Sequence, residues 1–256
     1  MEYNKIFLQD VFDYLETIQD NTVDLAVIDP PYNQKIDDWD TFETQEEYFA
    51  FCYQWLDKVV NKIKQQGSLY LFNNAYNSAF LLTYLVSKGL HFKNWIVWYK
   101  KDGFSPSKSK FVNNQEVILF FTKSDKYTFN ADMIRTPYLS TDRIKAAQQK
   151  GIIKNGKRWF PNQGGKLCTD VWEFSSERHN KKVNGKIAKT LHPTPKPEAL
   201  IERIIKASSN VGDTVLDLFS GSGTTAYLAQ KLDRQFTGCE SNIQYYQFII
   251  NRLQNK

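Results

Sequence analysis

The sequence has few of the residues that usually bind metals or form disulfides. It contains only three cysteines and three histidines. Cys52, Cys168 and Cys239 are far apart and show no C-x-x-C spacing, so we expect neither a disulfide framework nor a zinc site. The histidines are isolated from one another in the sequence, and we interpret them as structural. The composition therefore predicts a protein without a bound metal in a reducing compartment such as the cytoplasm.

Long apolar runs are also missing. No stretch approaches the roughly 20 apolar residues that cross a bilayer. The first ten residues, MEYNKIFLQD, lack the basic start and the apolar run of a signal peptide. We therefore expect no membrane partner. Apolar residues still make up 41% of the 256 residues, which is enough for the core of one large domain or two small ones.

Positive charge is concentrated in one segment. Residues 130–190 hold 13 Lys and Arg but five Asp and Glu, a net charge of +8, whereas the whole chain carries +5. Hydrophobic periodicity fades in the same segment, which predicts a loop-rich insertion in which Trp159 and Trp172 pack locally. A basic insertion on a slightly acidic body indicates a polyanionic partner, although a solvated lysine-rich loop has the same composition.

Outside this segment, short apolar runs alternate with amphipathic stretches. This pattern predicts an α/β fold, with a parallel sheet that is covered by helices on both faces. Gly67 is expected to end the first long helix. The predicted helices are 45–65, 75–87, 198–208, 224–232 and 242–253, and the seven predicted strands are 5–8, 23–28, 68–72, 94–99, 116–122, 214–219 and 235–239.

A glycine-rich loop joins strand 214–219 to the helix that follows it. The loop Ser220–Gly223 and Ala226 match the G-x-G-x-x-A fingerprint of nucleotide-binding proteins. Glu240 follows Gly221 by 19 residues at the end of the next strand, where a carboxylate accepts hydrogen bonds from ribose hydroxyls. A plain tight turn is the alternative interpretation of the glycines.

Acidic residues near this loop favour a cationic ligand over a dinucleotide. A dinucleotide places its pyrophosphate at the helix N-terminus, where nearby acids repel it. Asp217 lies two residues before Phe219, and Asp29 ends another predicted strand, so both would face the same crevice at the carboxyl ends of the strands. S-adenosylmethionine (AdoMet) carries an ammonium and a sulfonium but no phosphate, and it fits such a site better.

The position of the loop predicts the strand order. Only 33 residues follow Gly223, so most of the sheet must come from earlier in the chain. We expect strand 235–239 beside strand 214–219, and the N-terminal strand 5–8 outside it. The result is a circularly permuted, doubly wound sheet in which Asp10 ends the third strand of one half, near the adenine end of a bound cofactor.

A four-residue motif, Asp29-Pro30-Pro31-Tyr32 (DPPY), follows strand 23–28 directly. Neither proline has an N–H to donate, so the strand must end here and the chain leaves it stiffly. The motif therefore places a carboxylate and an aromatic ring at the carboxyl edge of the predicted sheet.

The order of three motifs resembles one family. DPPY comes first, the segment His192–Pro197 (HPTPKP) follows the basic insertion, and an FxGxG motif comes last. This order is similar to that of the beta-group amino-methyltransferases of restriction–modification systems, including the MboIIA-like adenine-N6 DNA methyltransferases. The resemblance implies a circularly permuted, AdoMet-dependent methyltransferase fold that is Rossmann-like, with a seven-stranded, mostly parallel sheet. It also implies a catalytic domain of residues 1–129 and 191–256 and a target-recognition region of residues 130–190.

The same resemblance implies residue roles in methyl transfer to the N6 amine of an adenine flipped out of double-stranded DNA. Asp29 and the carbonyl of Pro30, which Pro31 holds in place, would accept the hydrogen bonds of the amine, and Tyr32 would stack on the base. Thr194 and Lys196 would lie near the methionine carboxylate. The implied AdoMet contacts are Asp10, Asp29, His192, Thr194, Lys196, Asp217, Phe219, Ser220, Gly221, Ser222, Gly223, Thr224 and Glu240. The implied DNA contacts are Lys108, Lys110, Arg158, Arg178, Lys181 and Lys182.

Other functions and partners stay open at the level of sequence. An N4-cytosine methyltransferase would use the same motifs, but in this family Asp at position 29 goes more often with adenine. A nicotinamide oxidoreductase would explain the glycine loop but not DPPY, and a DNA- or RNA-binding module would explain only the basic insertion. The resemblance also implies a separately encoded restriction endonuclease as partner and is compatible with a homodimer. We expect the loop 33–44 to be mobile without DNA.

Overall fold

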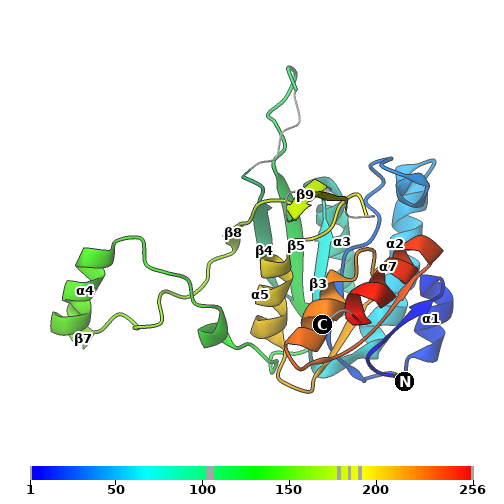
Figure 1. Cartoon of the computed structure of the whole chain (residues 1–256). Helices are drawn as coiled ribbons and strands as arrows, with labels where there is room; N and C mark the ends of the chain where they lie inside the picture. Colours follow the sequence, from blue (N-terminus) through cyan, green and yellow to red (C-terminus); the bar gives the residue numbers. More distant parts are fainter. Residues whose placement is uncertain (1, 102–106, 178–179, 184–185, 190–191, 255–256) are drawn as a thin grey trace.

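The centre of the molecule is a single eight-stranded sheet (Figure 1). The computed structural model describes residues 2–101, 107–177, 180–183, 186–189 and 192–254. Across the sheet the strands follow the order β1-β12-β11-β2-β3-β5-β4-β8. Their bounds are β1 Lys5–Leu8, β2 Val23–Ile28, β3 Ile63–Asn73, β4 His91–Tyr99, β5 Gln115–Thr122, β8 Val171–Glu173, β11 Thr214–Asp217 and β12 Gln235–Glu240.

The strand order confirms the predicted circular permutation. The N-terminal strand β1 pairs in parallel with β12, the last strand of the chain, and β12 pairs in parallel with β11. On its other edge β11 pairs in parallel with β2, and β2 with β3. Only β5 runs against its two neighbours, β3 and β4. The sheet is therefore mostly parallel, and the carboxyl ends of β1, β12, β11 and β2 lie next to one another on the same side of the molecule.

Three helices cover each face of the sheet and form two separate cores (Figure 1). Strand β3 shows the alternation that a strand buried on both faces requires. Its Leu69 and Leu71 face one core, and its Tyr70 and Phe72 face the other. The first core holds α1 Val11–Thr17, α2 Gln45–Lys62 and α3 Ala75–Ser87, and the second holds α5 Glu198–Ser208, α6 Thr224–Lys231 and α7 Ile243–Gln254. Two short 3-10 helices are η1 Asp38–Asp40 and η2 Ala131–Ile134. Among the described helices, none combines the length and the apolar character that crossing a membrane requires.

The predicted end of helix α2 was wrong. The helix ends at Lys62, and β3 begins at once with Ile63, which is buried and pairs with Val23 of β2. Gly67 lies inside β3 rather than at a helix end, close to a register shift in the pairing with β2. A Cβ at Gly67 would lie 2.6 Å from Cγ2 of Ile63 and 2.9 Å from the carbonyl oxygen of Asp24. Glycine is therefore needed here because β2 and β3 approach each other closely. The pattern of apolar residues along the sequence does not reveal such a contact.

The basic insertion is more ordered than its composition predicts. Residues 136–166, which we call the arm, extend away from the sheet (Figure 1). Backbone hydrogen bonds between Thr136 and Lys166 close the base of the arm. The arm contains helix α4 Thr141–Lys150 and a hairpin of β6 Ile152–Lys154 and β7 Lys157–Trp159. A second hairpin, β9 Asn180–Val183 with β10 Lys186–Lys189, follows nearer the body.

The eighth strand was not predicted, because it comes from the same insertion. Strand β8 pairs in parallel with the end of β4, and its Trp172 is only 5% exposed. The indole N–H of Trp172 donates to the carbonyl oxygen of Thr169 at 2.6 Å, and the Arg203 guanidinium lies 5.1 Å from the ring centroid. Local packing is thus confirmed for Trp172. Trp159, in the arm, is 53% exposed.

These two tryptophans give a test of how the insertion is attached. Trp172→Ala removes a buried ring that joins β8 to the second core, so it should lower the free energy of unfolding by about 3–5 kcal/mol. Trp159→Ala should change it by less than about 0.5 kcal/mol, because the ring is exposed. Chemical denaturation of both variants measures the difference. Equal losses would contradict the placement of β8 in the sheet.

Candidate active site

A cavity of about 320 Å³ opens at the carboxyl edge of the parallel strands. Four carboxylates that follow or end four of these strands line it: Asp10 after β1, Asp29 after β2, Asp217 of β11 and Glu240 of β12. The volume lies in the range of small-ligand sites. Every residue predicted to bind AdoMet lines the cavity except Gly223, and so do the three other DPPY residues. In the described part of the chain, no group of His, Cys, Asp and Glu is arranged to hold a metal ion.

The glycine loop forms one wall of the cavity and is held by Glu240. The Gly221 N–H donates to one carboxylate oxygen of Glu240 at 2.8 Å, and the Asn242 N–H donates to the other at 2.8 Å. Gly221 has φ +47°, and a Cβ there would lie 2.8 Å from Nε2 of His192. Gly223 instead is the N-cap residue of helix α6, with φ +69°, and packs against Ile249. Gly221 therefore allows the close packing of His192 in the cavity wall, whereas Gly223 allows the tight turn into helix α6.

Asp217 lies at the base of this wall and is 6% exposed. One carboxylate oxygen accepts the Phe219 N–H at 3.2 Å. Burial raises the pKa of Asp217 to about 7, and the negative charges of Asp29 and Glu240 act in the same direction. A buried carboxylate with a raised pKa is stabilised in its charged form by a cationic ligand, because such a ligand supplies the missing counter-charge.

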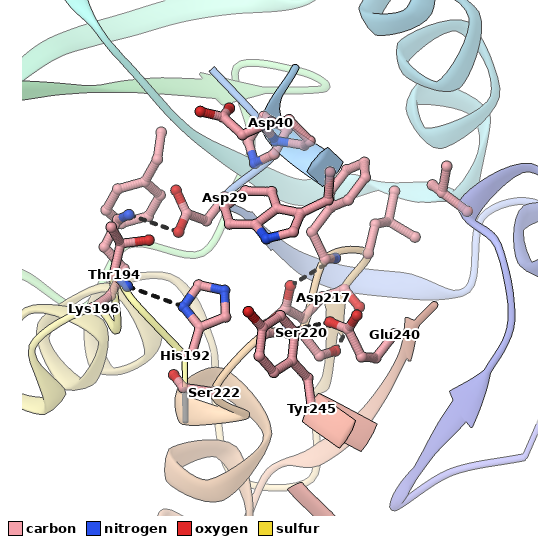
Figure 2. Close-up of a pocket in the computed structure, with 18 of the residues that line it drawn as sticks. Asp29, Asp40, His192, Thr194, Lys196, Asp217, Ser220, Ser222, Glu240 and Tyr245 are labelled. Carbon is pink, nitrogen blue, oxygen red and sulfur yellow. Dashed lines mark hydrogen bonds and ion pairs between the residues drawn. The ribbon is translucent and has the colours of Figure 1, made fainter. Parts of the chain in front are cut away.

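His192 belongs to a set of aromatic rings beside the glycine loop (Figure 2). Its ring centroid lies 4.8 Å from that of Tyr245 and 5.6 Å from that of Trp39. Burial lowers the pKa of His192 to about 4, with a further contribution from the Lys196 ammonium. The ring is therefore neutral near pH 7, and its Nδ1 accepts the backbone N–H of Thr194 at 3.2 Å.

Asp29 is engaged through both of its carboxylate oxygens. The Tyr32 hydroxyl donates to Oδ1 at 2.7 Å, and the Lys196 ammonium lies 2.6 Å from Oδ2 (Figure 2). Burial raises the pKa of Asp29 above its ordinary value, while the charge of Lys196 opposes the rise and that of Glu116 adds to it. The Asp29 side chain is still 26% exposed, so a substrate in the cavity can reach it.

Lys196 lies in the cavity wall, but its ammonium faces Asp29 rather than an open space for a carboxylate ligand. It is 9% exposed and lies 3.5 Å from Oε2 of Glu116. Burial alone would lower the pKa of Lys196, but the two carboxylates outweigh burial and raise it. The predicted contact of Lys196 with the methionine carboxylate stays a prediction, and its ion pair with Asp29 had no signal in the sequence.

Two further acidic residues of the site were missed by sequence reasoning. Glu116 at the start of β5 pairs with Lys100 and faces Lys196. Asp40 of η1 is 1% exposed and accepts the backbone N–H groups of Tyr32 at 2.6 Å, Asn33 at 2.9 Å and Gln34 at 2.9 Å. Asp40 therefore fixes the chain directly after DPPY. A carboxylate within a run of polar loop residues gives no hint of such a role.

The residues predicted to contact DNA are spread over separate elements. Lys108 and Lys110 are exposed in the connection between β4 and β5, and Arg158 is exposed on β7 of the arm. Lys181 and Lys182 belong to β9. Arg178 lies outside the described residues. Lys108, Lys110 and Arg158 do not line the cavity, and the assignment of all six residues to DNA stays a prediction.

The permuted sheet, the carboxylate-lined cavity and the DPPY turn beside a glycine loop together define an α/β methyltransferase of the amino-group type. A family model described as DNA methylase matches residues 23–252. The chain belongs to this family of DNA methylases.

Individual relatives agree with this assignment. The chain is 55% identical to the Type II methyltransferase M1.MboII of Moraxella bovis, over 99% of each chain. It is 31% identical to the Type II methyltransferase M.HpaI of Haemophilus parainfluenzae, over 94% of this chain and 71% of that one.

Two solved structures share the fold. The crystal structure of the M1.HpyAVI–SAM complex has a TM-score of 0.64 at 24% identity and covers 98% of both chains. The PvuII DNA methyltransferase, which is cytosine-N4-specific, has a TM-score of 0.74 at 18% identity and covers 100% of this chain and 88% of that one.

The hydrogen bonds of Asp40 predict a measurable effect on the catalytic turn. Asp40→Ala leaves three partly buried backbone N–H groups without their charged acceptor, so the free energy of unfolding should fall by about 2–3 kcal/mol. The amide hydrogens of residues 32–34 should also exchange faster with solvent. Asp38→Ala, an exposed neighbour in the same 3-10 helix, is the matched control. Unchanged exchange of residues 32–34 in Asp40→Ala would show that Asp40 does not hold the turn.

Proposed function

We propose that this protein transfers a methyl group from AdoMet to the N6 amine of adenine in double-stranded DNA, as the modification enzyme of a restriction–modification system. The observation that carries the proposal is a shared cavity. The DPPY turn and the glycine loop are far apart in the sequence but line the same space. A cofactor on the glycine loop and a base at Asp29 would therefore meet in one cavity.

The residues of the cavity fit AdoMet. When bound, AdoMet supplies a methyl group on a positively charged sulfur. Asp217 offers a buried carboxylate for the cationic part of the cofactor, and the absence of a Cβ at Gly221 lets the His192 ring pack against the glycine loop. Glu240 ends β12 and Asp10 follows the neighbouring strand β1, and we assign Glu240 to the ribose and Asp10 to the adenine end. The cofactor contacts of Ser220, Ser222 and Thr224 are part of the same proposal.

Asp29 and the carbonyl of Pro30 would prepare the target amine for attack. The lone pair of an adenine amino nitrogen is delocalised into the ring, so the nitrogen is a weak nucleophile. Two acceptors at its two N–H groups favour a pyramidal nitrogen and free that lone pair. Asp29 also stabilises the positive charge that develops on the nitrogen, and rigid positioning of the two reactants supplies a large part of the rate. The excess proton leaves to water after the transfer.

The base must leave the DNA helix to reach this cavity, and the basic insertion would hold the DNA. An amino group inside a duplex is inaccessible, so the target nucleotide is flipped out. We infer that residues 1–129 and 191–256 form the catalytic domain and residues 130–190 the target-recognition region. The charge of +8 in residues 130–190 supports phosphate contacts. The extended arm has the shape of a segment that reaches along a duplex (Figure 1).

An N4-cytosine methyltransferase is the second candidate. It is favoured by the fold shared with the cytosine-N4-specific PvuII enzyme, but at 18% identity this likeness concerns the fold alone. Adenine is favoured by Asp29 in the first position of DPPY, as the resemblance to the family implies. We further infer a cytoplasmic location and a separately encoded endonuclease as partner, since the 55% identical relative is a Type II methyltransferase. A homodimer stays a prediction.

The proposal predicts the modified base that the enzyme makes. DNA incubated with the protein and AdoMet should contain N6-methyladenine when it is digested to nucleosides and analysed by mass spectrometry. Asp29→Ala should lower the rate by at least about 10²–10³-fold, while DNA still binds. Asp20→Ala, exposed before the other end of β2, is the control. N4-methylcytosine as the product would refute the assignment to adenine, and no methylated base would refute the function.

Asp217 predicts a pH dependence of AdoMet binding. The cationic cofactor prefers the ionised carboxylate, and the pKa of Asp217 lies at about 7. Affinity should therefore rise with pH below about pH 7, by up to about tenfold per pH unit, and level off above it. Asp217→Asn should bind more weakly and lose this slope. Asp213→Asn, at the far end of the same strand, should keep it. A slope that persists in Asp217→Asn in calorimetric titrations would assign the effect to another group.

A further inference from the structure

Both carboxylate oxygens of Asp29 already have a donor in this structure. The Tyr32 hydroxyl occupies Oδ1 at 2.7 Å and the Lys196 ammonium occupies Oδ2 at 2.6 Å. In the proposed reaction, however, Asp29 must accept a hydrogen bond from the target amine. Each oxygen keeps a second lone pair, but Tyr32 and Lys196 draw on the same negative charge, so the amine binds Asp29 more strongly when one of these donors moves away.

Both donors already have a second acceptor, and it is the same oxygen. Oε2 of Glu116 lies 3.3 Å from the Tyr32 hydroxyl and 3.5 Å from the Lys196 ammonium. The other carboxylate oxygen of Glu116 is held by Lys100. Glu116 is therefore fixed at one oxygen while its other oxygen is positioned between the two groups that block Asp29. A shift of about 1 Å moves the Tyr32 hydroxyl or the Lys196 ammonium from contact with Asp29 to contact with Glu116.

The Lys196 ammonium cannot move into solvent when it leaves Asp29. Its side chain is 9% exposed, and its ammonium lies 5.4, 5.5 and 6.0 Å from the ring centroids of Tyr32, Phe72 and Trp98. An ammonium at such a site must stay paired, because an unpaired buried charge is strongly unfavourable. Glu116 removes this obstacle, since Lys196 can leave Asp29 without losing a carboxylate partner. Burial alone would raise the pKa of Glu116, but Lys196 and Lys100 outweigh burial and keep the pKa below its ordinary value.

We propose that Glu116 is a positioning residue for methyl transfer, which takes over Lys196 and Tyr32 from Asp29 when the target base enters the cavity. The exchange leaves Asp29 to bind the amine and keeps the buried Lys196 ammonium paired with a carboxylate. This inference rests on the proposed function, and it assigns Glu116 no contact with the cofactor or the base.

The rate of methyl transfer in a single turnover tests this role. Glu116→Gln removes the charge that attracts Lys196, so Lys196 stays on Asp29, and the rate at saturating AdoMet and DNA should fall by about tenfold or more. The affinity for AdoMet should not change, because Glu116 does not hold the glycine loop. Glu173→Gln is the matched control, since it removes an exposed carboxylate that pairs with Lys101, the neighbour of Lys100. Glu116→Asp, which keeps the charge, should recover part of the rate.

The pH profile separates positioning from a general loss of structure. Asp29 faces Lys196 from the segment before α5, Tyr32 from its own turn, Glu116 from β5 and Asp217 from β11. Loss of the Glu116 charge lowers the pKa of Asp29, because Glu116 contributes to raising it. The acidic limb of the rate profile should therefore move to lower pH in Glu116→Gln, although the plateau is lower. A merely destabilised protein would not shift this limb.

A second pair of variants keeps the inference testable if Glu116→Gln folds poorly. In Lys196→Met there is no ammonium to take over, so adding Glu116→Gln should lower the single-turnover rate by less than about twofold. An equal loss in both backgrounds would overturn the inference, and so would a Glu116→Gln rate within about twofold of the wild type. If the wild-type protein itself methylates no DNA, the proposed function fails instead. The two failures are thus distinguishable.

Discussion

The ion pair between Asp29 and Lys196 is the interaction on which the active site depends. It joins the DPPY turn, near the start of the chain, to the segment before α5, in the last quarter of the chain. A carboxylate and an ammonium at 2.6 Å in a poorly exposed site are stable only if their remaining hydrogen-bonding capacity is satisfied. Tyr32 and Glu116 supply these contacts. The circular permutation makes the pair possible, because it brings β2 and the last part of the chain to one edge of the sheet.

Other carboxylates of the site use the same chemistry for a different purpose. Asp40 and Glu240 accept backbone N–H groups, which cannot move without rebuilding a loop. They hold the turn after DPPY and the glycine loop in place. The partners of Asp29 are side chains, which can be exchanged by small rotations. The site thus combines fixed loops, which define where two reactants lie, with one carboxylate whose partners can change during the reaction.

Much of this arrangement could be predicted from the sequence, because it follows from local signals. The position of the glycine loop, 33 residues before the last residue, predicted the permuted sheet. The motifs and the family resemblance that they carry predicted about half of the residues that line the cavity. The missing parts depend on tertiary contacts. Gly67 resembles a helix end until the neighbouring strand is known, and β8 becomes a strand only beside β4. Glu116 and Asp40 carry no motif, since their importance arises from partners that are distant in the sequence or from backbone groups.

The central claim is that Asp29 is released from Lys196 and accepts the amine of a flipped base. A crystal structure of the protein with DNA and a non-reactive analogue of AdoMet tests it most directly. The account predicts the target amine within about 3 Å of Asp29, with Lys196 closer to Glu116 than to Asp29. A flipped base bound away from Asp29, with Lys196 still paired to that carboxylate, would contradict it.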